Sequence, residues 1–332
     1  MSRRVAIVLV AGALLMSACG TPPAPPAPQP TVAPTTQVTA CIPSRSDTIL
    51  PMFAAQDAGL LAQEHLQAEM PYFAGGQVDA ALIAGQCDFV FGAGGVGPLL
   101  QGVDVVVIAA TTTTSPGEVW ARPPLASLAD LKGHAIGTSG AGSLSWRVAR
   151  YYLQANGLTP DQDVAVLGTG DSAATFGAIT SGRVDAALLF PPDVFLADQH
   201  GLKQIYHAPK SMQLLNTGLV TTRRYLSAHR DIARSMVRAI TEAMRRLSGD
   251  EDFYAAELAK FTQSSLDLAS RDRYWHAAGE LYTIPPRIGL DGAVTALALY
   301  ADPASGQDLP ALARAWLDLS LVDELYPSAS TS

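Results

Sequence analysis

Glycine-rich turns are the parts of this sequence whose residue types and spacing could do chemistry. The stretch Asp88–Gly102, DFVFGAGGVGPLLQG, contains an unbroken G-x-G-x-x-G after a run of β-forming residues. Such a loop holds a pyrophosphate when a full helix follows it and an acidic residue stands about 20 positions further on. Pro98 leaves room for a short helix only, and the next predicted strand, Val105–Ala110, ends in Thr111–Thr114 without a carboxylate. The sequence therefore argues against a dinucleotide site and favours a turn that lets the backbone approach a smaller ligand.

A second motif, Gly137–Ala141 (GTSGA), resembles the G-x-S-x-G turn of hydrolases, but Ala141 replaces its last glycine. The aspartate and histidine of a triad are not identifiable, since His200 and His207 stand in polar, loop-like contexts. The six histidines show neither an i, i+4 pair nor the Cys/His spacing of a zinc site. The sequence therefore predicts a protein that is not an enzyme, with no catalytic residues, no metal ion and no cofactor; a hydrolase stays open as the alternative.

The N-terminal segment has the features of a secretion signal that ends at a lipid-modified cysteine. Two arginines precede the apolar run Val5–Met16, which is too short to span a bilayer stably. Met16-Ser17-Ala18-Cys19 resembles a bacterial lipobox, so residues 1–18 are predicted as a signal peptide and Cys19 as the lipidation site. Residues 19–37 hold seven prolines and no charge, which favours a semi-rigid polyproline II tether. We expect an extracytoplasmic protein, anchored by lipid to the cell membrane on its periplasmic side or outer surface; an ordinary secreted protein, with Cys19 incidental, is the alternative.

The body of the chain, from Val38 onward, is long enough for two domains, since a single hydrophobic core stops growing at roughly 250–300 residues. Of the whole sequence, 48% is hydrophobic and 16% charged, which is typical of a globular chain. The net charge is −8 and the basic residues form no stripe, which argues against nucleic acid as a partner.

Two further cysteines, Cys41 and Cys87, fall in predicted strands of one domain. An exported protein can form disulfides. The register that we estimate offsets the two cysteines by a few residues, which exceeds the reach of a disulfide. The sequence therefore favours two buried free thiols, with a bridge as the alternative.

Strand-like and helix-like segments alternate along the body, which indicates βαβ units and mostly parallel sheets. One internal echo supports two related lobes. Ala81–Phe91 (ALIAGQCDFVF) and Ala178–Leu188 (AITSGRVDAAL) share a pattern in which a helix ends at glycine and an aspartate opens the next strand. A glycine-terminated helix before a strand is common in α/β proteins, so a chance match stays open.

Six stretches between Val38 and Leu325, in this order and spacing, resemble the extracytoplasmic solute-binding proteins of ABC importers, in particular the nitrate/sulfonate/taurine and thiamine-pyrimidine group. They are FAAQDAGLLAQEHLQAEM, AALIAGQCDFVFG, VDVVVIAA, SLADLKGHAIGTSGAGS, ARYYLQANGLTPDQDV and AITSGRVDAALLFPP. The resemblance implies the periplasmic-binding-protein type II fold: α/β, with two lobes, each a mostly parallel sheet flanked by helices, and a ligand cleft between them.

The resemblance also implies where the chain crosses between lobes: near Gly117–Pro124 and again near Leu214–Gly218. Lobe one would then be residues 38–120 and 218–332, and lobe two residues 121–217. The implied partners are a small-molecule solute, an ABC permease transmembrane subunit with its ATPase, and the membrane through the N-terminal lipid; a monomer is expected. Delivery to a sensor instead of a transporter stays open.

The loops that follow the strands predict the ligand site, because ligands of such sheets bind at the carboxyl ends of the strands. These loops are rich in Gly, Ser and Thr, and backbone N–H groups at helix starts, aided by hydroxyls, hold anionic or polar groups. The candidate ligand-binding residues are Ser44, Arg45, Ser46, Asp47, Gly94, Gly95, Thr111, Thr112, Ser139, Gly140, Ala141, Ser143 and Phe190.

Three of these candidates have two interpretations each. Arg45 could pair with a sulfonate, carboxylate or phosphate oxygen, or face solvent at the edge of its loop. Asp47 is expected to cap a helix that begins at Thr48 in preference to touching the ligand. Phe190 could offer the ligand an apolar wall or belong to the core.

The sequence predicts the chemical class of the ligand. The loops and Arg45 favour a polar or anionic organic solute such as a sulfonate, nitrate or taurine-like molecule. A heteroaromatic vitamin or precursor, a thiamine pyrimidine or a flavin, stays open, with Phe73, Trp146 or Phe190 as stacking partners. A pyrimidine-precursor synthase shares the fold, but its relatives use a cysteine cluster and are cytosolic, whereas this chain has no such cluster and carries an export signal.

Overall fold

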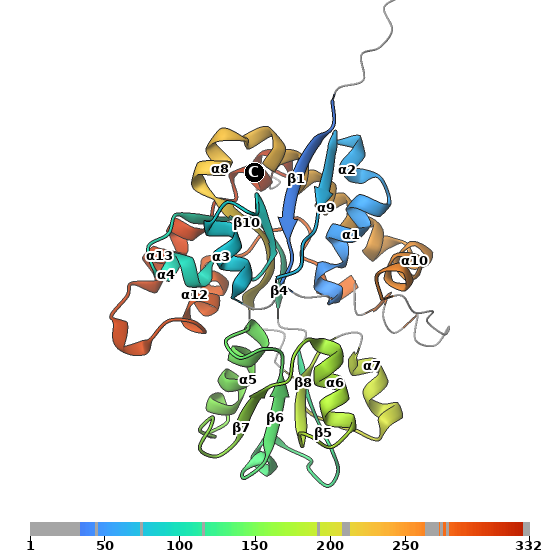
Figure 1. Ribbon diagram of the computed structural model, residues 1–332, viewed down its shortest axis with the longest axis vertical. Coiled ribbons are helices and arrows are strands. Elements are labelled where there is room, and N and C mark those ends of the chain that lie inside the picture. The colour runs from blue at the N-terminus through green and yellow to red at the C-terminus, as the bar shows by residue number, and fades with distance from the viewer. Residues whose placement is uncertain are drawn as a thin grey trace, which may run out of the picture. The chain divides into compact units, whose positions relative to one another are not determined.

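The computed structural model describes residues 34–43, 46–73, 76–114, 117–190, 193–207, 213–262, 272, 275–276 and 279–327. The chain divides into residues 1–34 and residues 35–332, and the second unit holds the described helices and strands. Two five-stranded sheets organise this unit (Figure 1). We call the part built on the first sheet, before residue 115 and after residue 212, lobe one, and the part built on the second, residues 117–207, lobe two.

The sheet of lobe one has the order β2-β1-β3-β10-β4. Its strand β10 runs antiparallel to both neighbours, and the β2-β1 and β1-β3 pairs are parallel. The strands are β1 (Thr36–Cys41), β2 (Leu66–Glu69), β3 (Phe89–Gly92), β4 (Val105–Thr114) and β10 (Gln213–Thr222).

The sheet of lobe two repeats this plan with the order β7-β6-β8-β5-β9, and again the fourth strand, β5, is the reversed one. The strands are β5 (Glu118–Ala121), β6 (Ala135–Thr138), β7 (Ala165–Gly168), β8 (Ala186–Leu189) and β9 (Lys203–His207). The matching order agrees with the two related lobes that the internal echo predicts. Each sheet is mixed, with one reversed strand.

Helices cover both faces of each sheet, because successive strand residues point to opposite faces. In lobe two, Leu188 packs with α5 in one hydrophobic cluster and Leu189 packs with α6 and α7 in another. In lobe one, α1, α2, α8, α9, α10 and α14 cover one face, and α3, α4, α12 and α13 the other. The helices are α1 (Leu50–Asp57), α2 (Leu60–Gln63), α3 (Gln77–Ile83), α4 (Val96–Leu100), α5 (Leu144–Ala155), α6 (Ser172–Thr180), α7 (Asp193–Ala197), α8 (Arg223–Ala228), α9 (Arg230–Gly249), α10 (Glu251–Thr262), α12 (Leu290–Ala298), α13 (Leu309–Trp316) and α14 (Ser320–Leu325), with short 3₁₀ helices at Asp47–Ile49, Leu128–Leu131, Asp198–His200 and Pro303–Ser305.

The glycines of the echo end their helices in the same way. Gly85 follows α3 with a φ of 72°, and Gly182 follows α6 with a φ of 79°. This left-handed backbone conformation favours glycine and closes a helix C-terminus.

The aspartates of the echo make the same pair of hydrogen bonds. Thr39 donates its N–H to Asp88 Oδ2 at 2.8 Å and accepts the Asp88 N–H at 2.9 Å. Ala135 does the same with Asp185, both distances being 3.0 Å. In each lobe an aspartate thus fixes the strand that follows the helix against its parallel neighbour, β1 in lobe one and β6 in lobe two.

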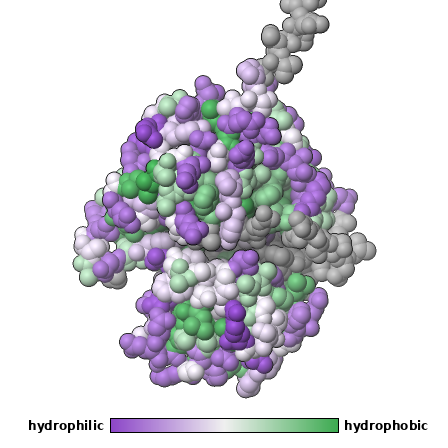
Figure 2. Space-filling model, in the orientation of Figure 1, coloured by the Kyte–Doolittle hydropathy of each residue, from purple (hydrophilic) through white to green (hydrophobic). Residues whose placement is uncertain are grey.

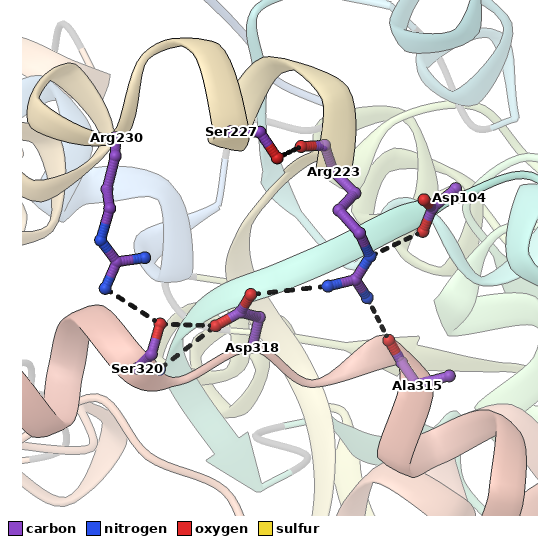
Figure 3. A network of polar contacts seen from close by, with 7 residues as sticks. All are labelled: Asp104, Arg223, Ser227, Arg230, Ala315, Asp318 and Ser320. Atoms are coloured by element: carbon purple, nitrogen blue, oxygen red, sulfur yellow. Dashed lines mark hydrogen bonds and ion pairs between the residues drawn. The ribbon is translucent and has the colours of Figure 1, made fainter.

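Arg223, at the start of α8, connects the C-terminal helices to the sheet of lobe one (Figure 3). Its guanidinium donates to Asp104 Oδ1 at 3.0 Å and to the Ala315 carbonyl at 2.9 Å, and lies 3.6 Å from Asp318 Oδ2. Asp318 in turn accepts the Ser320 hydroxyl at 2.6 Å. One side chain therefore joins the start of β4, the end of β10 and the connection from α13 to α14.

Cys41 and Cys87 form a disulfide, with 5.8 Å between their Cα atoms, so the expectation of two free thiols was wrong. Cys87 lies between two bends, at Gln86 and Asp88, and does not belong to β3. The offset that we counted along two extended strands therefore does not apply. A disulfide is typical of oxidising compartments.

The chain passes from the sheet of lobe one to that of lobe two between Thr114 and Glu118, and returns between His207 and Gln213. The resemblance implied a first crossing near Gly117–Pro124, and within that range Glu118–Ala121 pairs with strands of lobe two. No helix among the described residues is long and apolar enough to cross a membrane. On the face shown in Figure 2, hydrophilic residues surround small hydrophobic areas on both lobes.

Candidate functional site

A cleft of about 430 Å³ is lined by residues of both lobes. This volume lies in the range of small-molecule sites, roughly 300–1,000 Å³. Its walls come mainly from loops at the carboxyl ends of strands. The lining residues are Pro43, Ser46, Thr48, Ile49, Tyr72, Gly76, Val78, Asp79, Gly92, Ala93, Gly94, Asn216, Thr217 and Tyr300 from lobe one, and Ser139, Gly140, Ala141, Gly142, Ser143, Leu144, Ser145, Gly170, Asp171, Ser172 and Phe190 from lobe two.

The loop after β6 is the largest element of the lobe-two wall, and its serines order it. Ser143 is the N-cap of α5 and accepts the Trp146 N–H at 3.3 Å. The Ser143 and Ser145 hydroxyls lie 3.0 Å apart, and Ser145 Oγ accepts the Ser139 N–H at 3.2 Å. The wall therefore ends at the first turn of a twelve-residue helix, where backbone N–H groups carry partial positive charge.

Gly168, at the end of β7, makes room for this loop. A Cβ at Gly168 would lie 2.8 Å from the Ala141 nitrogen and 3.2 Å from the Ser139 carbonyl oxygen. The loop crosses the end of β7 at a distance that no larger residue permits.

Asp171 and Ser172 bring a second helix start to the lobe-two wall. Asp171 is the N-cap of α6, and its Oδ1 accepts the Ala174 N–H at 2.9 Å. Because Asp171 lines the cleft and is exposed, its carboxylate can also meet a ligand.

Asp79, from α3, is the carboxylate of the lobe-one wall. Its Oδ1 accepts the Gly95 N–H at 2.7 Å. Burial raises the pKa of Asp79, and the hydrogen bond from Gly95 partly offsets this rise. Gly95 has a φ of 88°, and a Cβ there would lie 2.9 Å from Val220 Cγ1, so this position requires glycine.

Ser46 and Thr48 lie beside each other in the lobe-one wall, with their hydroxyl oxygens 2.9 Å apart. Asn216 and Thr217 reach the cleft from β10. These four residues are buried, so their hydrogen-bonding groups line the cleft with little access to water.

Asp47 has a different place from the one expected. It is the first residue of the 3₁₀ helix Asp47–Ile49, whose N-cap is Ser46, so the capping role was wrong. Asp47 is 2% exposed and does not line the cleft. Its Oδ1 atom has no hydrogen-bond partner among the described atoms. Burial, with the charge of Asp193 as a smaller cause, raises the pKa of Asp47 to about 8.

Thr111 and Thr112 lie within β4, so the expectation that they form a loop after the strand was wrong. Threonine is β-branched and suits a strand, and β4 continues to Thr114, which pairs with Gln213 of β10. Thr111 donates its hydroxyl to the Thr217 carbonyl at 3.0 Å, and neither threonine lines the cleft.

The other candidates divide into two groups. Ser46, Gly94, Phe190 and the four candidates of the loop after β6 (Ser139, Gly140, Ala141 and Ser143) line the cleft, and Gly95 contributes through its bond to Asp79. Ser44, Arg45 and Cys19 lie outside the described residues.

Sequence reasoning missed Asp79, Asp171, Tyr72 and Tyr300. Asp171 had a usable signal, because it opens a helix directly after a glycine-rich strand end, as Ser143 does. Asp79 and Tyr300 come from α3 and from the end of α12, far from any strand end. Among the described residues, no group of three or more His, Cys, Asp or Glu could hold a metal ion.

The comparisons with known proteins agree with this architecture. A family model described as NMT1/THI5 like matches residues 47–250. No curated protein matches the sequence.

Solved structures with the same fold cover nearly the whole chain. A protein from Bordetella bronchiseptica RB50 is 23% identical, with a TM-score of 0.73 over 88% of this chain and 98% of its own. The alkanesulfonate-binding protein SsuA from Xanthomonas axonopodis pv. citri, bound to MOPS, is 19% identical, with a TM-score of 0.67 over 86% of this chain and 100% of its own. The periplasmic nitrate-binding protein NrtA from Synechocystis PCC 6803 is 12% identical, with a TM-score of 0.68 over 89% of this chain and 90% of its own. At these low sequence identities the structural similarity shows the fold alone. It confirms the predicted two-lobed periplasmic-binding-protein-like fold.

Proposed function

Since the chain belongs to the NMT1/THI5-like family, we propose that it is an extracytoplasmic solute-binding protein of an ABC importer. It captures a small polar or anionic organic solute by closing its cleft and delivers the solute to a membrane permease with its ATPase. Hinge closure of two lobes around a ligand is a known mechanism of such proteins. The function named for each of two solved relatives is binding, of an alkanesulfonate in one and of nitrate in the other.

The observation that carries this proposal is the cleft itself. The starts of α5 and α6 both open into it, at Ser143–Ser145 and Asp171–Ser172. The first N–H groups of a helix have no partner within the helix and attract anionic or polar groups. A sulfonate-like group at this wall would accept several such hydrogen bonds at once.

A thermal-shift assay tests the proposal, with a panel of sulfonates, nitrate, bicarbonate, thiamine pyrimidine and flavins. A ligand that binds only the folded state stabilises it by about 2.7 kcal/mol at 100 times its dissociation constant. We expect stabilisation by at least one member, recovered chemically unchanged. Consumption of the ligand would contradict the proposal and indicate an enzyme.

A matched pair of variants locates the site. Ser139→Trp fills the cleft and should abolish the stabilisation by the solute, while the melting temperature of the ligand-free protein changes little. Ser181→Trp, at the exposed end of α6 away from the cleft, should leave binding intact. Equal binding by both variants would place the ligand elsewhere.

A second candidate solute is a heteroaromatic vitamin or precursor, a thiamine pyrimidine or a flavin. Two carboxylates, Asp79 and Asp171, line the cleft from different lobes, and they suit the N–H donors of such a ring system better than a sulfonate. Tyr72, Phe190 and Tyr300 supply aromatic faces. In the thermal-shift panel this candidate is favoured by a response to the pyrimidine or the flavin without one to the sulfonates.

The lipobox-like sequence at Cys19 extends the proposal to the anchor. Acyl chains contribute about 0.8 kcal/mol per buried methylene, so two or more hold a protein at a membrane. Cys19→Ala should move the protein from the membrane fraction to the soluble fraction. Continued membrane association of this variant would contradict lipidation at Cys19.

A further inference from the structure

Arg147 lies in the first turn of α5, and its guanidinium contacts both lobes. We propose that Arg147 is the positioning residue that holds the ligand-binding loop of lobe two against lobe one, so that cleft closure depends on this side chain. The inference rests on the proposed function only in that it assigns the loop to ligand binding. The contacts themselves involve protein atoms only.

Three contacts carry the inference. Arg147 Nε donates to the Gly142 carbonyl at 3.1 Å, within the lobe-two loop. One terminal nitrogen donates to the Leu299 carbonyl of lobe one at 3.3 Å. The guanidinium carbon lies 4.0 Å from the centre of the Tyr300 ring. Since Gly142 and Tyr300 both line the cleft, one side chain contacts both of its walls.

Arginine suits this position through its shape. The guanidinium is planar, with donors in its plane and a face that stacks on an aromatic ring. Arg147 therefore donates to two carbonyls from two nitrogens while its face lies on Tyr300. A lysine ammonium is a compact charge without such a face, so it cannot make all three contacts at once.

Apolar packing supports the same junction. Leu299, which accepts the hydrogen bond from Arg147, packs against the lobe-two core cluster that also receives Leu144 and Trp146. Burial raises the pKa of the neighbouring Tyr300 to about 12, and the charge of Arg147 partly offsets this rise. The end of α12 is therefore seated on α5 through both an apolar and a charged contact.

Arg150, three residues further along α5, is a natural control. Its guanidinium lies 4.3 Å from the centre of the Trp146 ring and pairs with Asp161, and both partners belong to lobe two. Arg150 thus offers the same side chain, on the same helix and with a similar stacking contact, but these two contacts stay inside one lobe.

The junction has a functional consequence. If closure moves the lobe-two loop toward the wall of lobe one, then the contacts of Arg147 with Leu299 and Tyr300 form only as the lobes approach. A group that contacts the closed state alone shifts the equilibrium toward it, and the same shift tightens ligand binding.

A distance measurement on the full-length, ligand-free protein tests this. Gln154 of lobe two and Asp291 of lobe one are both exposed. Each is replaced by an unnatural amino acid that carries a spin label. Pulsed electron paramagnetic resonance then measures the distance between the two labels, which reports the separation of the lobes. Loss of a cation–π contact and a charged hydrogen bond of ordinary strength predicts a fall of about tenfold in the ratio of closed to open molecules in Arg147→Met. Arg147→Lys should fall between the wild type and Arg147→Met, and Arg150→Met should match the wild type.

The melting temperature is measured beside the distances, because a purely structural role would lower it without changing the separation of the lobes. An unchanged distance distribution in Arg147→Met overturns the inference. So does an equal shift in Arg150→Met, or a wild type without a short-distance population. No solute is added, so a failure of the solute panel would count against the proposed function and leave this result as it stands.

Discussion

Lobe one and lobe two share one strand order and one device, yet they differ in how they are reinforced. In both, an aspartate fixes the strand after a glycine-ended helix to its parallel neighbour in the sheet. Lobe one adds the Cys41–Cys87 disulfide, two ten-residue strands and the C-terminal helices that Arg223 holds in place. Lobe two has strands of four or five residues. The shared aspartate therefore belongs to the common plan of both lobes, while the disulfide, the long strands and the Arg223 contacts stabilise lobe one only.

The largest expected effect concerns the disulfide of lobe one. Cys41 and Cys87 are 46 positions apart, and closing a loop of that length stabilises a protein by about 4 kcal/mol in the chain-entropy model. The double variant Cys41→Ser/Cys87→Ser should lose about this much free energy of unfolding, measured by urea titration. A reducing agent should lower the stability of the wild type and leave the double variant unchanged. Equal free energies of unfolding in the wild type and the double variant would contradict this role.

The shared aspartates should give the next largest effect, and an equal one. Asp88→Ala and Asp185→Ala each remove a carboxylate that accepts a backbone N–H at 2.8 or 3.0 Å. We expect each to cost about 2 kcal/mol of unfolding free energy, because the donor loses its partner. The asparagine variants keep an acceptor oxygen and should cost less. A loss of unfolding free energy in one variant without a similar loss in the other would show that the two aspartates are not equivalent.

Asp47 of lobe one and Asp193 of lobe two both have raised pKa values, and they test whether burial affects the stability of the two lobes to the same degree. The pKa of Asp47 is raised to about 8 and that of Asp193 to about 7, in both cases mainly by burial. A raised carboxyl pKa means that the folded state holds a proton that the unfolded state releases, so stability falls as the pH rises from about 4 toward 8. Asp47→Asn should remove part of this fall and raise the melting temperature at pH 8 more than at pH 5. Asp193→Asn should act in the same direction but less, because Asp193 is only partly buried.

Parallel pH-stability curves for Asp47→Asn and the wild type would show that Asp47 is ionised in the folded protein. Asp47 would then make no contribution to the pH dependence of stability, and the two lobes would not differ through this residue.

The glycines that end α3 and α6 should give the smallest effects. An L-residue in the left-handed conformation costs roughly 1–2 kcal/mol, so Gly85→Ala should lower the unfolding free energy by about 1 kcal/mol. Gly182→Ala should cost slightly more, because the new Cβ would lie 2.6 Å from a terminal nitrogen of Arg122, which must move. Thermal unfolding of the two variants side by side measures the difference. A smaller cost at Gly182 would contradict the contact.

Much of the fold could be predicted from local pattern. The repeated helix, glycine and aspartate indicated two related lobes because the same residues solve the same turn. The Ser139–Ser143 loop was found because the carboxyl ends of parallel strands meet at one edge. Both predictions depend on chain geometry over about ten residues, which sequence reveals well.

The remainder depends on packing between distant segments. Asp79 reaches the cleft because α3 lies beside the start of α4, and Tyr300 because the end of α12 rests on α5. The disulfide depends on a bend before β3 that a strand-based register does not contain. Thr111 and Thr112 belong to a strand because β10 returns to pair with it. In each case the deciding partner is far away in the sequence.

That return of β10 also sets an order of assembly. Strand β10 lies between β3 and β4, although all of lobe two separates it from them in the sequence. As the chain leaves a ribosome or a translocation channel, the continuous lobe two can fold as a unit while β3 and β4 still lack their common partner. Until residues 213–222 arrive, both strands keep a bare hydrogen-bonding edge, which is a site for misassembly. Lobe one contains the first strand, β1, yet it is the lobe that is completed last.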